Sequence, residues 1–108
     1  MKTIADNEVI IKIGQNASEN CSLLTSSNPD DLFFHLSSFP SCFVILETKD
    51  TDLEQTLIYC ATLCKEHTKF KFIPNISVDY CKCSNVKLIG TRGEIEYISN
   101  RQVKKLQV

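Results

Sequence analysis

Residues 30 to 46 read Asp-Asp-Leu-Phe-Phe-His-Leu-Ser-Ser-Phe-Pro-Ser-Cys-Phe-Val-Ile-Leu, and this stretch decides the fold. Two apolar runs, Leu32 to Leu36 and Cys42 to Leu46, flank a short polar connection. Each run has the length of a strand and is rich in aromatic or β-branched residues. Pro40 suits the connection because it cannot donate a hydrogen bond to a sheet. The stretch therefore predicts two neighbouring antiparallel strands.

The side chains of an extended Leu32 to Leu36 alternate between two faces. Leu32, Phe34 and Leu36 share the face that we expect in the core. Phe33 and His35 share the other, where an aromatic ring beside an imidazole marks a candidate functional surface. The run from Cys42 to Leu46 is apolar throughout, which is typical of a central strand covered on both faces.

Two helices are predicted from capping boxes, in which an N-cap residue is followed three residues later by a carboxylate. Asn16 and Glu19 open the first, which we expect to continue to about Thr25. Thr51 and Glu54 open the second, predicted over about residues 51–69. Its apolar residues recur at helical spacing and form one buried face: Leu53, Leu57, Cys60, Ala61 and Cys64.

The remaining strands are predicted from alternation at Glu8 to Ile13, Ile76 to Tyr80, around Ile95 and Tyr97, and Val103 to Val108 at an edge. Residues 86–89 are expected to extend the second of these strands, and residues 91–93 to form a turn. The order predicts one α+β domain over residues 1–108, with two helices and a largely antiparallel or mixed sheet of five to six strands.

Composition limits the function. The chain is 43% hydrophobic and 23% charged, as in ordinary soluble proteins. No apolar run approaches the roughly 18 residues of a membrane span, and the N-terminus lacks the apolar core of a signal peptide. We therefore expect a cytoplasmic protein with no membrane partner, whose six cysteines are free thiols.

The formal net charge of −1 hides an asymmetry. Residues 1–60 carry three basic and nine acidic side chains, whereas residues 61–108 carry nine basic and four acidic ones. The second part could present a local positive surface to an anionic partner. A solvated helix end and loops are the alternative explanation. Phe70 and Phe72 alternate with Lys69 and Lys71, so we expect both rings in the core.

Two kinds of chemistry have weak support. Cys60, Cys64, His67, Cys81 and Cys83 could be assembled into a zinc site, but their spacings are poor for one, and small core residues explain them better. Cys42 and His35 could be cross-strand neighbours, yet the sequence shows no oxyanion hole or thiol-activating group. We expect no enzymatic activity, no cofactor and no bound metal.

Three stretches together resemble the NFACT-R domain family. Gly14-Gln15-Asn16-Ala17-Ser18-Glu19-Asn20, Asp30-Asp31-Leu32-Phe33-Phe34-His35 and Pro40-Ser41-Cys42-Phe43-Val44-Ile45 are similar, in this order, to the family's G-R-N-A-x-x-N, D-D-L-W-F-H and P-G-S-H-V-I. The resemblance continues through the helix ending at Thr68-Lys69 and the later strands, and it covers nearly all of the chain. Asn16, Asn20, Phe34 and His35 match the family, whereas Gln15, Phe33 and Phe43 replace its Arg, Trp and second His.

The resemblance implies a stand-alone, diverged RNA-binding module that acts with tRNA or the large ribosomal subunit in ribosome-associated quality control. The partners implied are tRNA or ribosomal RNA, and with them the ribosomal subunit or a protein. A diverged protein-interaction or scaffold domain without a nucleic-acid ligand is the alternative. The candidate RNA-binding residues are Asn16, Asn20, Phe33, His35, Lys65, Lys69, Lys71, Lys82, Lys87 and Arg92.

Overall fold

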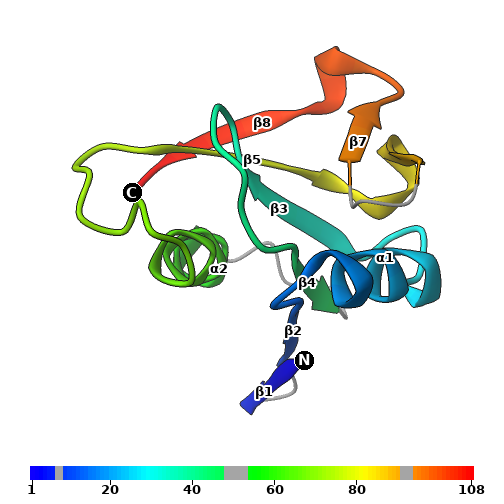
Figure 1. Ribbon diagram of the computed structural model, residues 1–108, viewed down its shortest axis with the longest axis horizontal. Helices are drawn as coiled ribbons and strands as arrows, with labels where there is room; N and C mark the ends of the chain where they lie inside the picture. The colour runs from blue at the N-terminus through cyan, green and yellow to red at the C-terminus, as the bar shows by residue number, and fades with distance from the viewer. Residues whose placement is uncertain (7–8, 48–53, 91–93) are drawn as a thin grey trace.

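The computed structural model describes residues 1–6, 9–47, 54–90 and 94–108. Six strands form the main sheet and two further strands form a small hairpin (Figure 1). In chain order, the elements are β1 (Lys2–Asp6), β2 (Val9–Ile13), α1 (Ala17–Ser26), β3 (Leu32–Leu36), β4 (Val44–Glu47), α2 (Glu54–Glu66), β5 (Ser77–Lys82), η1 (Cys83–Asn85), β6 (Val86–Ile89), β7 (Glu94–Tyr97), η2 (Asn100–Gln102) and β8 (Lys104–Gln107). The predicted α+β class is confirmed.

The main sheet has the order β1-β2-β4-β3-β5-β8, and every neighbouring pair is antiparallel. As predicted, β3 and β4 are neighbours, with Phe34 opposite Val44. β4 is central and its residues 44–46 are buried, while β8 lies at an edge. β1, which was not predicted from the sequence, pairs with β2 along its whole length.

Each face of the main sheet has its own apolar core. Helix α2 covers one face, where Leu57, Cys60, Ala61 and Cys64 pack against Phe34 and the other residues of that face. Helix α1 and the β6–β7 hairpin cover the opposite face, where Phe33 lies (Figure 1). Consecutive residues of β3 thus enter different cores. The predicted buried face of α2 is confirmed for its described members; Leu53 and the Thr51 cap lie outside the described residues.

Helix α1 begins as predicted. The Asn16 side chain accepts a hydrogen bond from the Glu19 backbone N–H at 2.9 Å, and the Glu19 carboxylate accepts one from the Gln15 N–H at 3.0 Å. The first bond satisfies a donor that the helix itself leaves unpaired, and the second fixes the backbone just before the cap. Helix α2 ends at Glu66, a little before the predicted residue 69. Over the described segments, neither helix is long and apolar enough to cross a membrane.

Residues 86–89 do not extend β5, which corrects the prediction. The short helical turn η1 redirects the chain after Lys82, and β6 pairs with β7 in a separate hairpin. Asn85 anchors this hairpin, because its side chain exchanges two hydrogen bonds with the backbone of Ser99 at 2.8 and 2.9 Å. The hairpin then folds back over the sheet, with Leu88 and Ile95 against the second core.

Candidate nucleic-acid interface

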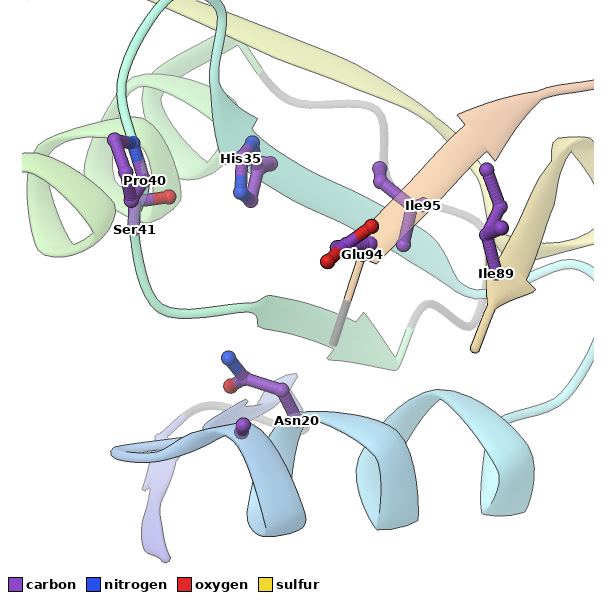
Figure 2. Close-up of a pocket in the computed structure, with 8 residues that line it drawn as sticks. Asn20, His35, Pro40, Ser41, Ile89, Glu94 and Ile95 are labelled. Carbon is purple, nitrogen blue, oxygen red and sulfur yellow. The ribbon is translucent and has the colours of Figure 1, made fainter. Parts of the chain in front are cut away.

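A groove opens on the sheet face that α1 and the hairpin cover. It has a volume of about 500 Å3. Figure 2 shows Asn20 of α1 on one side of the opening; across it, His35 of β3 lies between Pro40 and Ser41 and the hairpin residues Glu94, Ile95 and Ile89. The full lining consists of Ala17, Asn20, His35, Pro40, Ser41, Ile89, Glu94 and Ile95. The structure therefore brings together Asn20 and His35, which the sequence analysis proposed as parts of one site.

Asn20 is held in place by the backbone. Its side-chain Oδ1 accepts a hydrogen bond from the Phe43 N–H at 3.1 Å, and the residue is buried. Gly14 makes room for it, because a Cβ atom at that position would lie 2.2 Å from Oδ1. The motif residues Gly14 and Asn20 therefore join the end of β2 to α1 and β4, and their first role is structural.

His35 presents one ring nitrogen to the groove. Nδ1 lies 2.7 Å from the Leu36 carbonyl oxygen. Since a carbonyl only accepts, Nδ1 carries the hydrogen, and the neutral ring has its lone pair on Nε2. Nε2 has no hydrogen-bond partner among the described residues, where every buried side-chain nitrogen or oxygen has one, so Nε2 must reach solvent. Burial lowers the pKa of His35, despite the Leu36 carbonyl and Asp79, which act in the opposite direction.

Phe33 is fully buried, with 0% of its surface exposed. Its ring lies 4.9 Å from that of Phe43, centroid to centroid, and nearly parallel to the His35 ring at 6.1 Å. The predicted stacking role of Phe33 is therefore wrong for this conformation, because neither face of the ring is free. Phe33 instead supports the His35 ring from within the core.

Asn16 is exposed, but its side chain caps α1 and it does not line the groove. Two candidate residues offer a polar atom there that has no partner among the described residues: Asn20, through its amide nitrogen Nδ2, and His35, through Nε2. Of the two atoms, His35 Nε2 is the acceptor. A ligand would meet it between the apolar hairpin residues Ile89 and Ile95 and the carboxylate of Glu94. None of the eight lining residues is a lysine or an arginine. The groove thus suits a flat, mostly apolar group with a hydrogen-bond donor better than it suits a phosphate.

The candidate lysines do not form one cluster. Lys65 lies at the end of α2, and Lys69 and Lys71 follow it, near the start of β5. Lys82 and Lys87 lie at the other end of β5 and on the hairpin. The ends of a six-residue strand are about 17 Å apart. Arg92 lies outside the described residues.

The Lys69–Phe72 segment is a turn, which corrects the prediction of two core rings. Phe70 is partly buried and stacks on Phe39, with centroids 4.3 Å apart. Phe72 is 85% exposed. The alternation in the sequence suggested a strand, but the chain turns here before β5.

A carboxylate that the sequence analysis did not select lies opposite His35 on β5. Asp79 is buried and accepts hydrogen bonds from Ser37 Oγ at 2.6 Å, Lys105 Nζ at 2.6 Å and the Tyr97 hydroxyl at 3.1 Å. Burial, with the nearby Asp79 charge, raises the pKa of Tyr97, which keeps its hydroxyl protonated as a donor. A charged residue within an apolar strand was the signal available in the sequence.

The cysteines lie in different cores. Cys60 and Cys64 belong to α2 and lie in the core between that helix and the sheet, whereas Cys81 and Cys83 lie on the opposite face of the sheet. The four thiols therefore cannot meet around one metal ion. Cys42 is not a partner of His35 either: its thiol lies in the α2 core, 3.8 Å from the Cys64 carbonyl oxygen.

Comparison with known proteins relates the chain to NFACT proteins. A stretch of 78 residues, 71% of the chain, is 32% identical to the Rqc2 homolog RqcH of Bacillus subtilis (strain 168). The matched region spans only 14% of the length of that protein. No family model matches the chain.

The fold itself has a solved counterpart. The solved C-terminal part of the fibronectin/fibrinogen-binding protein from Streptococcus suis matches this fold with a TM-score of 0.84. The match covers 94% of the present chain and 41% of the solved chain. The sequence identity is 22%, so this likeness concerns the fold alone.

Proposed function

We propose that this domain is an RNA-binding module of the NFACT-R type, which works in the cytoplasm with tRNA or the large ribosomal subunit in ribosome-associated quality control. The observation that carries the proposal is the 32% identity to RqcH over 78 residues. The groove adds a physical reason, because it joins Asn20 and His35 from separate motifs of the resemblance.

In this proposal the groove holds a base, and exposed lysines outside it hold the backbone. His35 Nε2 accepts a hydrogen bond from the edge of an unpaired base, and Ile89 and Ile95 contact its face. The phosphates are then contacted by basic side chains outside the groove. Lys87 is exposed and lies on the same strand face as Ile89, two residues away, and Lys82 is exposed at the end of β5. Binding and not catalysis is the proposed activity.

Binding of fluorescein-labelled bulk tRNA and of purified large subunits tests the proposal. Ile89→Glu should weaken binding, because it places a second carboxylate beside Glu94 in the groove. Ile98→Glu is the matched control: Ile98 is 69% exposed and is not part of the groove lining. Equal binding by both variants, or no binding by the unaltered protein at low salt, would contradict the proposal.

The salt dependence gives a second readout. Each phosphate contact on a single strand adds about −0.7 to the slope of log K against log salt. Replacing Lys82 and Lys87 together by Ala should therefore reduce the magnitude of the slope by about 1.4. Lys2 and Lys104, both exposed and outside the candidate set, supply the control pair.

A protein-interaction domain is the second candidate. Ile58 and Tyr59 are 43% and 47% exposed on the outer side of α2, away from the core that its Leu57 and Cys60 enter. The division of the lysines between two ends of the sheet also favours this candidate. It predicts that Tyr59→Ala, and not Ile89→Glu, disrupts co-sedimentation with ribosomal subunits.

A further inference from the structure

The turn that follows α2 displays one aromatic ring. The Ile73 N–H donates to the Phe70 carbonyl oxygen at 3.0 Å, so Lys71 and Phe72 are the two central residues of a tight turn. Phe72 is 85% exposed, more than any other large hydrophobic residue described in the chain. A ring in this position adds nothing to either core.

The turn is anchored on both sides. Before it, the Phe70 ring stacks on Phe39 and the Phe70 N–H donates to Thr68 Oγ1 at 3.1 Å. After it, Ile76 exchanges two backbone hydrogen bonds with Val108, each 2.9 Å long. The backbone on both sides of Phe72 is therefore fixed, and little conformational entropy would be lost when Phe72 binds a partner.

The charges around the ring are mainly positive. Lys71 Nζ lies 5.2 Å from the centroid of the Phe72 ring, and Lys69 Nζ lies 5.5 Å from that of Phe70. Lys65, at the end of α2, places its ammonium 3.0 Å from the Val108 carbonyl oxygen, and Val108 pairs with Ile76 after the turn. Residues 65–73 contain these three lysines and one acid, Glu66.

We infer that this turn is a second RNA contact, at which Phe72 stacks on an unpaired base while Lys69 and Lys71 hold the adjoining phosphates. Single-strand recognition combines an accessible aromatic face with cations that follow the backbone. A duplex offers no free base face along its length, so the ligand is single-stranded RNA or a loop. Phe72 and the adjacent Ile73, which is 40% exposed, are flanked by ammonium groups, and this surface is too small and too polar to serve as an apolar docking face for a protein.

This inference rests on the proposed function but uses a different part of the surface. The turn lies near the start of β5, whereas Lys82 lies at the other end of that strand. The two contacts can therefore be changed separately. Phe72 also takes the stacking role that the buried Phe33 cannot fill.

Fluorescence anisotropy with labelled oligouridylate, alone and annealed to its complement, tests the inference on the whole protein. Phe72→Ala should weaken single-strand binding by about 5-fold or more with an unchanged salt slope. Phe72→Tyr keeps the ring and should retain binding. Lys69 and Lys71 replaced together by Ala should reduce the magnitude of the slope by about 1.4. Ile98→Ala, another exposed apolar residue, is the control.

The chain contains no tryptophan, so Phe72→Trp creates a single reporter at the contact. Its fluorescence should be quenched by the single strand and not by the duplex. RNA binding that persists equally in every Phe72 and lysine variant, without quenching, would overturn the inference and leave the proposed function standing. No binding of RNA or subunits by the unaltered protein would overturn both. Binding of anionic vesicles that depends on Phe72, without RNA binding, would replace RNA by a lipid surface.

Discussion

Asn20 Oδ1 accepts a hydrogen bond from the Phe43 backbone N–H at 3.1 Å, and this contact ties α1 to the strand segment that leads into β4. The bond is buried and lies at the wall of the groove. It links two stretches that are 23 residues apart in the chain. Removing this bond should therefore lower the stability of the fold before it affects the binding of any ligand.

Asn20→Ala should destabilise the domain by about 1–3 kcal/mol, because the Phe43 N–H is then buried without an acceptor. Gly14→Ala should act on the same bond, since the new Cβ would displace Oδ1. The two changes should be less than additive in urea unfolding. Ser22→Ala, on the exposed side of α1, is the control. Full additivity would show that Gly14 acts independently of Asn20.

Leu57→Ala should cost about 2–5 kcal/mol, because it leaves a cavity between α2 and the sheet. The adjacent Ile58 is 43% exposed, and Ile58→Ala should change the free energy of unfolding by less than about 0.5 kcal/mol. Equilibrium unfolding in urea measures both. A loss below half a kilocalorie for Leu57 would mean that this face of α2 is not packed as described.

Lys105→Ala should destabilise the domain by about 1–3 kcal/mol, because it removes a charged donor from the buried Asp79 carboxylate. Lys104→Ala should have little effect, since Lys104 is exposed and has no acidic partner in the part of the chain that the structure describes. Comparison of the two thermal midpoints separates the ion pair from a general effect of charge. Equal shifts would show that the hydrogen bonds from Ser37 and Tyr97 are enough to stabilise the buried Asp79 carboxylate.

His35 should make stability depend on pH. Its pKa in the folded protein is lowered below the ordinary 6.5, mainly by burial, so the unfolded chain binds a proton first as the pH falls. The contribution of neutral His35 is fully present above about pH 6.5 and is lost as the pH falls through the folded-state pKa. The unaltered protein should therefore lose more stability than His35→Gln on acidification from about pH 8 to 5. Parallel curves would contradict this assignment.

The elements that local patterns define were predictable from the sequence. The runs in β3 and β4, the Asn16 cap and the apolar face of α2 each depend on residues close together in the chain. β1 was missed because it is mostly exposed, with no alternation that marks a half-buried strand.

The site depended on contacts distant in sequence, which local patterns cannot reveal. Phe33 and His35 were placed correctly on one face of β3, but α1 and the folded-back hairpin bury Phe33 and leave His35 at the groove. The direction of the hairpin is set by the Asn85–Ser99 hydrogen bonds. Because these hydrogen bonds cannot be read from the sequence, Val86 to Ile89 resembled a continuation of β5. For the same reason, the contacts that Asp79 makes with distant side chains could not be inferred.

The position of β8 has a consequence for how the chain matures during synthesis. β5 pairs with β3 on one side and with β8 on the other, and β8 leaves the ribosome after all the other strands of this sheet. Until residues 104–107 emerge, the backbone groups along one side of β5 are unpaired and free to join a strand from another molecule. During the same interval Asp79 lacks the ammonium of Lys105. The half of the sheet that carries His35 is thus completed late, and an incomplete chain is at greatest risk of aggregation through β5.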